Sequence, residues 1–439
     1  MTVSIRGAHL IDPASGLDKV CDLHIEAGRI IAIGDAPEGF HAAQEIDAAG
    51  LIAAPGLVDL SVALREPGYS RKGSIESETR AAAAGGVTSL CFPPQTKPVL
   101  DTSAVAELIL DRAREAGNAK VFPIGALTKG LAGEQLSELV ALRDAGCVAF
   151  TNGLAPMASN RVLLRSLEYA ATFDLTVIFT SQDHDLAEGG LAHEGPTASF
   201  RGLAGIPETA ETVALARNLL LVEQSGVRAH FSQLTSARGV ELIAQAQARG
   251  LPVTADVALY QLILTDEALA DFSSLYHVQP PLRSQKDREA LREAVKSGVI
   301  QAIASHHQPH EADAKNAPFA ATDPGISSVE LLLPLAMTLV QDGLLDLPTC
   351  SHACRPARLP PCACRPASWR SARPPTWCCS KPTARPWRAR PGTPVARTAR
   401  SSATACRAWC AAPWWTGISS TRSDASPHHE KARRLAGFS

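Results

Sequence analysis

Short apolar segments alternate with amphipathic segments through most of the chain, and the two patterns predict strands and helices in turn. Near-continuous apolar runs predict eight strands, the first beginning at residue 57 and the others spanning 87–92, 120–125, 148–151, 176–180, 228–233, 253–257 and 300–305. Segments with helical spacing follow, at 74–84, 104–116, 134–145, 160–172, 208–224, 239–249, 286–297 and 328–340. Eight such strand–helix units in about 250 residues are typical of an α/β fold of the (β/α)8 barrel type.

The alternative to a barrel is a doubly wound open sheet. No glycine-rich phosphate-binding loop opens any predicted helix, which weakens that alternative. Ahead of the barrel, residues 2–55 contain short alternating strands separated by turns, among them Val3–Ile5 and Cys21–Ile25. We therefore expect a small β domain in residues 1–55 and the barrel in residues 56–345.

The composition of the chain changes abruptly near residue 349. Residues 1–349 hold 26 Lys or Arg and 42 Asp or Glu, a formal charge of −16, whereas the remainder holds 16 basic and two acidic residues, a charge of +14. The remainder also holds all six Trp and eight of the 11 Cys, with few aliphatic residues that could form a core. Residues 346–439 are therefore treated as a separate tail rich in Arg, Pro, Cys and Trp, for which the composition favours disorder.

Zinc binding, nucleic-acid binding and a shifted reading frame could each account for the unusual composition of the tail. Zinc ribbons need paired Cys-x2-Cys spacing, which Cys362-x-Cys364 and Cys406-x3-Cys410 lack. A nucleic-acid-binding arm would suit the basic charge, but no fold motif accompanies it. A reading frame shifted near residues 345–355 fits better, because Arg, Pro, Ala, Cys, Trp and Ser are what a GC-rich coding region yields out of frame. We expect no further strand from the tail.

The first predicted barrel strand carries a row of positions that face the expected site. Side chains alternate along a strand, so Asp59, Ser61, Ala63 and Arg65 lie on one face. Active sites of (β/α)8 barrels lie at the carboxyl ends of the strands, where this row ends. A serine hydroxyl is a poor zinc ligand and alanine has no donor atom, so neither Ser61 nor Ala63 can serve well as a metal ligand.

Three turn motifs connect the sequence to a known family. They are Leu64-Arg65-Glu66-Pro67-Gly68, Gln279-Pro280-Pro281-Leu282-Arg283 and His307-Gln308-Pro309-His310. With these motifs, roughly residues 3–345 resemble the dihydroorotase family of the amidohydrolase superfamily. The resemblance implies a small β-sandwich ahead of the barrel, zinc bound at the strand ends, and hydrolysis of a cyclic amide.

The resemblance also locates the positions of the family's zinc ligands in this chain, and most of them hold a different residue. The family pattern has two His on strand one, a carboxylate after strand four, a His after strand five, and an Asp after strand eight that is both ligand and general base. The residues at those positions here are Ser61, Ala63, Asn152, Thr180 and His306. Of the usual ligands only His230 on strand six remains, so we expect no metal site, no cofactor and no catalytic residue.

The positions that contact substrate in the family have changed less. Arg65 and His310 are in place, whereas Gln95 and Gln279 stand where the family has Asn, and each adds a methylene at the pocket wall. We expect these four residues to form at most a vestigial ligand site.

Two questions about these residues stay open at the level of sequence. His306, His307 and His310 could combine with His230 to rebuild a single-metal site, although alternation points His306 inward and His307 away. Arg65 could hold a carboxylate ligand, or it could pair with a local acid such as the adjacent Glu66.

The resemblance is to dihydroorotase-like chains that lack catalysis and assemble with the catalytic chain of aspartate carbamoyltransferase. It implies a structural subunit of a hetero-oligomer in de novo pyrimidine biosynthesis. The alternative is an active, zinc-dependent cyclic-amide hydrolase of the dihydroorotase or hydantoinase type with a divergent metal site, and a third possibility is a small-molecule sensor that uses Arg65. No signal peptide and no apolar segment of membrane-spanning length are found, so we expect a cytoplasmic protein with no membrane or nucleic-acid partner.

Overall fold

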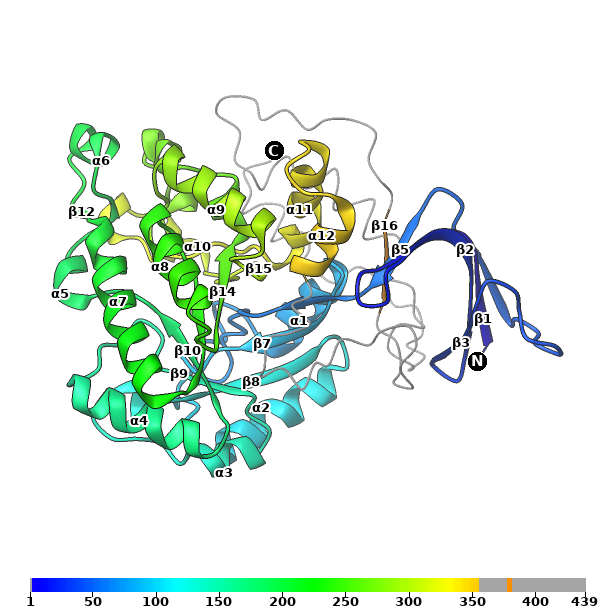
Figure 1. Cartoon of the computed structure of the whole chain (residues 1–439), viewed down its shortest axis with the longest axis horizontal. Coiled ribbons are helices and arrows are strands. Elements are labelled where there is room, and N and C mark those ends of the chain that lie inside the picture. The colour runs from blue at the N-terminus through cyan, green and yellow to red at the C-terminus, as the bar shows by residue number, and fades with distance from the viewer. Residues whose placement is uncertain (1, 355–376, 381–439) are drawn as a thin grey trace.

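Two large sheets organise the chain in the computed structural model, which describes residues 2–354 and 377–380 (Figure 1). The first sheet contains the strands β1 (Thr2–Asp12), β2 (Leu17–Glu26), β3 (Arg29–Ile33), β4 (Gln44–Asp47) and β5 (Ile52–Pro55). β1 and β2 form a long antiparallel hairpin, and β1 pairs in parallel with β4 and β5. Alternate residues such as Ile5, Leu10 and Leu23 are buried and give this sheet its own small core.

A short strand of the tail completes the edge of the first sheet. β16 (Trp377–Ser380) pairs antiparallel with β5, in a register that sets Trp377 against Pro55 and Ser380 against Ile52. The expectation that the tail supplies no strand is therefore wrong. Backbone groups form this ladder, and a composition poor in aliphatic residues does not prevent it.

The second sheet consists of eight parallel strands in chain order. They are β6 (Leu57–Asp59), β7 (Val87–Phe92), β8 (Lys120–Ala126), β9 (Ala149–Thr151), β10 (Thr176–Thr180), β13 (Arg228–Ser232), β14 (Val253–Ala258) and β15 (Ala302–Ala304). Just beyond β6 and β15 the first and last strands meet, because Ala63 N–H donates to the carbonyl oxygen of His307 at 2.9 Å and His307 N–H donates to that of Ser61 at 3.1 Å. The prediction of a (β/α)8 barrel is confirmed, and the open sheet is excluded.

Helices cover the outer face of the barrel (Figure 1). They are α1 (Ile75–Ala84), α2 (Ser103–Ala116), α3 (Leu139–Asp144), α4 (Asn160–Thr172), α7 (Glu208–Ser225), α8 (Ala237–Ala248), α9 (Gln285–Ser297), α11 (Leu332–Gln341) and α12 (Leu347–Ala353). Capping boxes begin α1 at Ser74 and α9 at Ser284, which satisfies amide groups that have no partner within the helix. Most of these helices begin and end within three residues of the predicted bounds.

The helix predicted at 134–145 is the main exception. Only Leu139–Asp144 is helical, because the preceding residues form a tertiary contact with the loop after β8. Ser137 N–H donates to the carbonyl oxygen of Leu127 at 3.1 Å, and Lys129 N–H donates to that of Gln135 at 2.8 Å. These bonds hold the segment extended, and tertiary pairing overrides its helical spacing.

The remaining elements were not predicted, and most follow the carboxyl ends of strands. α5 (His184–Ala187), β11 (Ala192–His193), α6 (Pro196–Arg201) and β12 (Gly205–Ile206) lie between β10 and α7. Six 3-10 segments and one short helix follow other strands: η1 (Lys129–Leu131), η2 (Leu259–Leu262), η3 (Asp266–Asp271), η4 (Ser274–Tyr276), α10 (Ala312–Lys315), η5 (Phe319–Ala321) and η6 (Val329–Leu331). Together they build the rim around the expected site.

The barrel continues nine residues past the predicted boundary at 345. α12 packs against α11, and Val58 N–H donates to the carbonyl oxygen of Cys354 at 3.1 Å. Cys350 and Cys354 are buried. The predictions of disorder and of a shifted frame concern residues that, apart from these and β16, lie outside the described part of the chain.

None of the described helices is long and apolar enough to cross a bilayer.

Candidate functional site at the carboxyl ends of the barrel strands

Asp256 on β14 is the centre of the polar side chains inside the barrel. Its Oδ2 accepts hydrogen bonds from His230 Nε2 at 2.8 Å and from Ser232 Oγ at 2.9 Å. Its Oδ1 accepts from His306 Nε2 at 2.8 Å and from the backbone N–H of Gln233 at 2.8 Å. Four donors thus satisfy one buried carboxylate, and we call these five residues the Asp256 cluster.

The Asp256 cluster holds its charge on the carboxylate. Burial alone would raise the pKa of Asp256, but the facing rings of His306 and His230 outweigh burial and hold the pKa well below its ordinary value. An ionised carboxylate only accepts hydrogen bonds, so the Nε2 atoms of both rings carry protons and donate. His230 Nδ1 is hydrogen-bonded to the hydroxyl of Thr254, at 2.9 Å.

A zinc ion does not fit these residues as they are arranged. Zinc needs lone pairs from three or four side chains, whereas the facing Nε2 atoms of His230 and His306 are engaged with Asp256. Within residues 2–354 and 377–380, no three His, Cys, Asp or Glu side chains are grouped so as to hold a metal ion. The absence of a metal from this protein stays a prediction.

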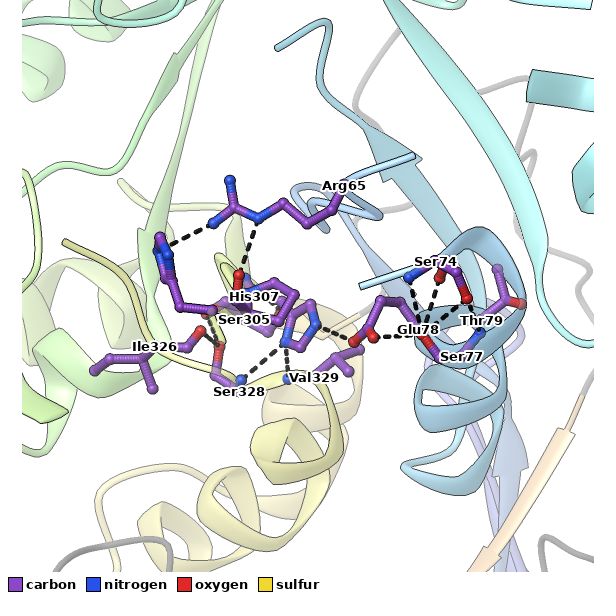
Figure 2. A network of polar contacts seen from close by, with 12 residues as sticks. Arg65, Ser74, Ser77, Glu78, Thr79, Ser305, His307, Ile326, Ser328 and Val329 are labelled. Carbon is purple, nitrogen blue, oxygen red and sulfur yellow. Dashed lines mark hydrogen bonds and ion pairs between the residues drawn. The ribbon is translucent and has the colours of Figure 1, made fainter. Parts of the chain in front are cut away.

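His307 points toward Glu78 on helix α1 (Figure 2). Its Nδ1 accepts from the backbone N–H groups of Ser328 and Val329, at 2.9 and 3.2 Å. Its Nε2 therefore carries the proton and donates to Glu78 Oε2 at 2.7 Å. His306 points inward and His307 outward, as strand alternation predicts, and the two rings cannot share a metal ion.

Arg65 and His310 meet at the rim rather than inside the barrel. Arg65 Nε donates to the carbonyl oxygen of Pro309 at 3.0 Å, and one of its terminal nitrogens lies 3.1 Å from His310 Nε2. Lys72 Nζ donates to His310 Nδ1 at 3.2 Å and also pairs with Asp323 at 2.6 Å. The tautomer that accepts from Lys72 donates through Nε2 to the carbonyl oxygen of Pro324, at 3.0 Å.

Burial and the cationic surroundings keep His310 neutral. Burial, followed by the charges of Arg65 and Lys72, lowers the pKa of His310 to about 4. Burial also lowers the pKa of the Arg65 guanidinium, which the charges of Asp323 and Glu311 partly offset. The suggested pair between Arg65 and Glu66 is wrong, because Glu66 Oε2 accepts the backbone N–H of Ile75 at the start of α1.

Strand one contributes backbone rather than ligands. The peptide groups of Ser61 and Ala63 close the barrel against His307, as described above. Beneath them, Asp59 Oδ1 accepts the backbone N–H groups of Ser305 at 3.1 Å and Ser61 at 3.3 Å. Burial raises the pKa of Asp59, and these hydrogen bonds offset only part of that rise.

Asn152, which follows the fourth barrel strand β9, also has a structural role in this chain. Asn152 Oδ1 accepts from the hydroxyl of Thr128 at 2.6 Å, and its Nδ2 donates to the carbonyl oxygens of Leu131 and Ala155 at 3.4 and 3.2 Å. Its amide thus joins the loop after β8 to the loop after β9. Thr180, at the end of β10, lies in the wall of a neighbouring cavity.

The two Gln at positions where the family pattern has Asn form no hydrogen bond with the Asp256 cluster. Gln95 is exposed, and its amide rests against Gly153, where a Cβ would lie 2.2 Å from Gln95 Nε2. Gly153 has a φ of +59°, so both its conformation and this contact favour glycine. Gln279 is half-buried in the segment after η4.

The Pro-Pro-Leu-Arg motif ends in Arg283, whose side chain contacts two separate segments of the rim. Arg283 is buried, and its Nε donates to Thr235 Oγ1 at 2.8 Å. One of its terminal nitrogens lies 3.0 Å from His193 Nδ1 and 3.3 Å from the carbonyl oxygen of Ile206. The motif therefore joins the loop after β13 to the insertion between β10 and α7.

Sequence reasoning missed Asp256 and Glu78, the two carboxylates that hold the inward and outward His. One signal was present for Asp256, since it is the only charged residue in the apolar strand Val253–Ala258, and a charge on a buried strand needs partners. Glu78 lies in the first turn of α1, where acidic residues are common, and gave no such signal.

A closed parallel barrel preceded by a small β sheet, with His and Arg side chains at its strand ends, defines the class of protein as a (β/α)8 barrel with an added β domain. The L-hydantoinase (dihydropyrimidinase) of Arthrobacter aurescens has the same fold, with a TM-score of 0.72 and 24% identity over 81% of this chain and 82% of that one.

Sequence comparison is more specific. A family described as "Dihydro-orotase-like" matches residues 50–238. Two relatives named "Dihydroorotase-like protein", from Pseudomonas aeruginosa and Pseudomonas putida, are 85% and 79% identical over 349 residues, which cover 80% of this chain and 82% of each relative. A "Dihydroorotase" from Syntrophotalea carbinolica is 42% identical over 79% of this chain and 81% of its own length. The chain belongs to the dihydroorotase-like family.

Proposed function

We propose that this chain is a catalytically inactive dihydroorotase homologue that serves as an assembly subunit of aspartate carbamoyltransferase in de novo pyrimidine biosynthesis. In this role the barrel contributes a rigid surface to a hetero-oligomer, and a separate dihydroorotase carries out the hydrolysis. The Asp256 cluster is the observation that carries the proposal.

The chemistry of cyclic-amide hydrolysis supports an inactive site. The reaction needs an activated water, which a metal supplies by lowering the pKa of a bound water, and a carboxylate that moves the proton. Ser61 and Ala63 at one strand end and Thr180 at another offer no good zinc ligand. The carboxylate nearest the retained His230 is Asp256, and its two oxygens already accept four hydrogen bonds.

The comparisons support the family part of the proposal only. The Pseudomonas relatives carry the name "Dihydroorotase-like protein", whereas the relatives near 40% identity are named "Dihydroorotase". The partner is proposed from the resemblance of the sequence to subunits of this kind. A fold can outlast its active site when its surface is still needed.

Co-purification tests the partner directly. The full chain is co-expressed with the catalytic chain of aspartate carbamoyltransferase from the same cell, with an affinity tag on one partner only. We expect the two chains to elute together in size-exclusion chromatography, at a mass above that of either alone. Separate elution, together with full transferase activity in the absence of this chain, would contradict the assembly role.

The alternative is an active, zinc-dependent cyclic-amide hydrolase with a rebuilt site. The proximity of His230 and His306 in one cluster is the observation that favours it. Metal analysis and dihydroorotate turnover of the purified chain separate the two functions. One zinc ion per chain with measurable turnover would replace our proposal by this alternative.

A further inference from the structure

A cavity of about 200 Å3, separate from the one beside Thr180, lies next to the carboxyl ends of β14 and β15. The 3-10 segments η2, η4 and η6 and the helices α10 and α11 contribute its wall. Arg65 and the five residues of the Asp256 cluster do not line it. Since an apolar cavity of about 150 Å3 can hold benzene, this one has room for roughly eight non-hydrogen atoms.

Most of the wall is aliphatic. Each of η2, η4, η6 and α11 contributes a leucine, and the loops between them add two more aliphatic side chains: Leu259, Leu275, Leu331, Leu335, Leu264 and Ile326. Leu259 and Leu335 are buried, whereas Leu275 is 45% exposed and marks the side that opens to solvent. This wall stabilises an apolar ligand by removing it from water, and it opposes the burial of a charge.

One charged side chain interrupts the aliphatic wall. It is Lys315, half-buried at the end of α10. Its Nζ donates to the carbonyl oxygens of Asp323 at 2.6 Å, Ser274 at 3.2 Å and His277 at 3.5 Å. The two residues between Ser274 and His277 line the cavity, as Lys315 itself does, so the ammonium group lies at the edge of the cavity.

The ammonium group of Lys315 has no carboxylate partner among the described residues. Asp323 turns its carboxylate to Lys72 instead, at 2.6 Å. Burial, with the charges of Arg65 and Lys72, lowers the pKa of Lys315 to about 8, and the charge of Asp323 opposes this only in part. The contact with His277, at 3.5 Å, is long for an N–H···O hydrogen bond, so one donor is available to a stronger acceptor.

The other polar groups of the wall add no second charge. His310 is neutral, and both of its ring nitrogens are hydrogen-bonded, to Lys72 and to the carbonyl oxygen of Pro324. A dicarboxylate would therefore bury its second charge against leucines, and a cation would meet Lys315. An uncharged molecule would leave the ammonium without a counter-charge. The wall thus selects a molecule with one carboxylate and an apolar body.

We propose that this cavity binds a short-chain monocarboxylate of about six carbons, with its carboxylate on Lys315 and its chain against Leu259, Leu264 and Leu335. The site goes beyond the assembly role and involves no chemical step. Failure of the co-purification would leave this site intact, and failure of binding would leave the assembly role intact.

The first test uses the unaltered full chain and three six-carbon probes in isothermal titration calorimetry. Hexanoate has one carboxylate, hexanamide has none, and adipate has a second carboxylate at the other end. We expect one saturable site for hexanoate and binding weaker by about tenfold or more for each of the others, because hexanamide loses a charge-assisted contact and adipate buries a charge. No saturable binding of hexanoate, or equal binding of hexanamide or adipate, would overturn the proposal.

The second test uses matched variants of the two ends of the site. Lys315→Met should remove the preference for hexanoate over hexanamide, whereas Lys120→Met, at the exposed start of β8, should keep it. Leu264→Ala should move the preferred chain length from hexanoate toward octanoate, because it enlarges the aliphatic part of the wall. A loss of fold would weaken all probes alike and would not change either preference. A Lys315→Met variant that still prefers hexanoate, or a Leu264→Ala variant with the original chain-length preference, would refute the proposal.

Discussion

On the β13–β15 side of the barrel mouth, polar side chains bond to one another, whereas on the β9–β10 side they border a cavity. The two carboxylate oxygens of Asp256 accept four hydrogen bonds, and each of the other four residues of the cluster donates one of them. Gln182 Oε1, in contrast, is buried without a partner among the described residues. The two sides belong to the same ring of strand ends. They differ in whether their buried polar atoms have hydrogen-bond partners among the described residues.

Under the proposed function, the two sides are two outcomes of losing metal ligands. Where the replacing residue can donate, as His306 can, a carboxylate and its neighbours form a closed network that needs no ion. Where the replacing residue is short and neutral, as Thr180 is, space remains beside it. A closed network stabilises the barrel, and an open space can take a ligand.

The largest expected effect is at the closed side. Asp256→Ala removes the acceptor for two buried His, Ser232 and the Gln233 amide, and should destabilise the chain by about 3–5 kcal/mol, as removal of one partner from a buried ionic network does. Urea denaturation measures it. Asp271→Ala, at an exposed position, serves as the control and should cost less than about 0.5 kcal/mol. Equal effects of the two variants would remove the distinction between the sides.

A second substitution asks whether the closed side can be reopened. His306→Asp introduces the residue that the family resemblance implies after strand eight, but it sets a second carboxylate beside Asp256 and removes one of its donors. One of the two acids must then take a proton, so we expect a loss of about 3 kcal/mol and no stoichiometric zinc. The left-handed backbone at position 306 accepts Asp readily, so strain is not the cause. A variant that gains one zinc ion per chain would show that the remaining residues can still form a zinc site once His306 is replaced.

The smallest expected effect concerns pH and the rim. The pKa of His310 is about 4 in the folded chain and about 6.5 when unfolded, so the unfolded chain takes up a proton first as the pH falls. Stability should therefore fall between pH 6.5 and pH 4, by roughly 1 kcal/mol once solvent screening is allowed for. Urea denaturation of the unaltered chain and of His310→Gln at pH 7 and pH 4 measures the difference. If both proteins lose the same amount of stability between pH 7 and pH 4, the pH dependence comes from groups other than His310.

Sequence patterns predicted the barrel strands because burial on both faces leaves a continuous apolar run that few other structures produce. They also predicted that His306 and His307 diverge, and the two rings do point to different partners, although the backbone at His306 is left-handed rather than extended. The turn motif that ends in Arg283 was noticed for its family likeness, and its contacts with Thr235 and Ile206 give it a physical reason.

Other features depend on contacts between distant segments, which a single sequence does not show. Glu78 and His307 are 229 residues apart, and neither is unusual in its local context. The short α3 has helical spacing that is overridden by bonds to the loop after β8. The cavity beside Thr180 depends on how five segments pack against one another, and the spacing of residues in a sequence does not predict a cavity.

The pairing of β16 with β5 has a consequence for fragments of this chain. The ladder joins main-chain groups of residues 377–380 to those of residues 52–55, and main-chain recognition is indifferent to most side chains. A chain cut short after residue 354 would present β5 as a bare strand edge, and bare edges recruit strands from other molecules. Such a fragment should self-associate, and a short synthetic peptide without proline should suppress that association by occupying the edge.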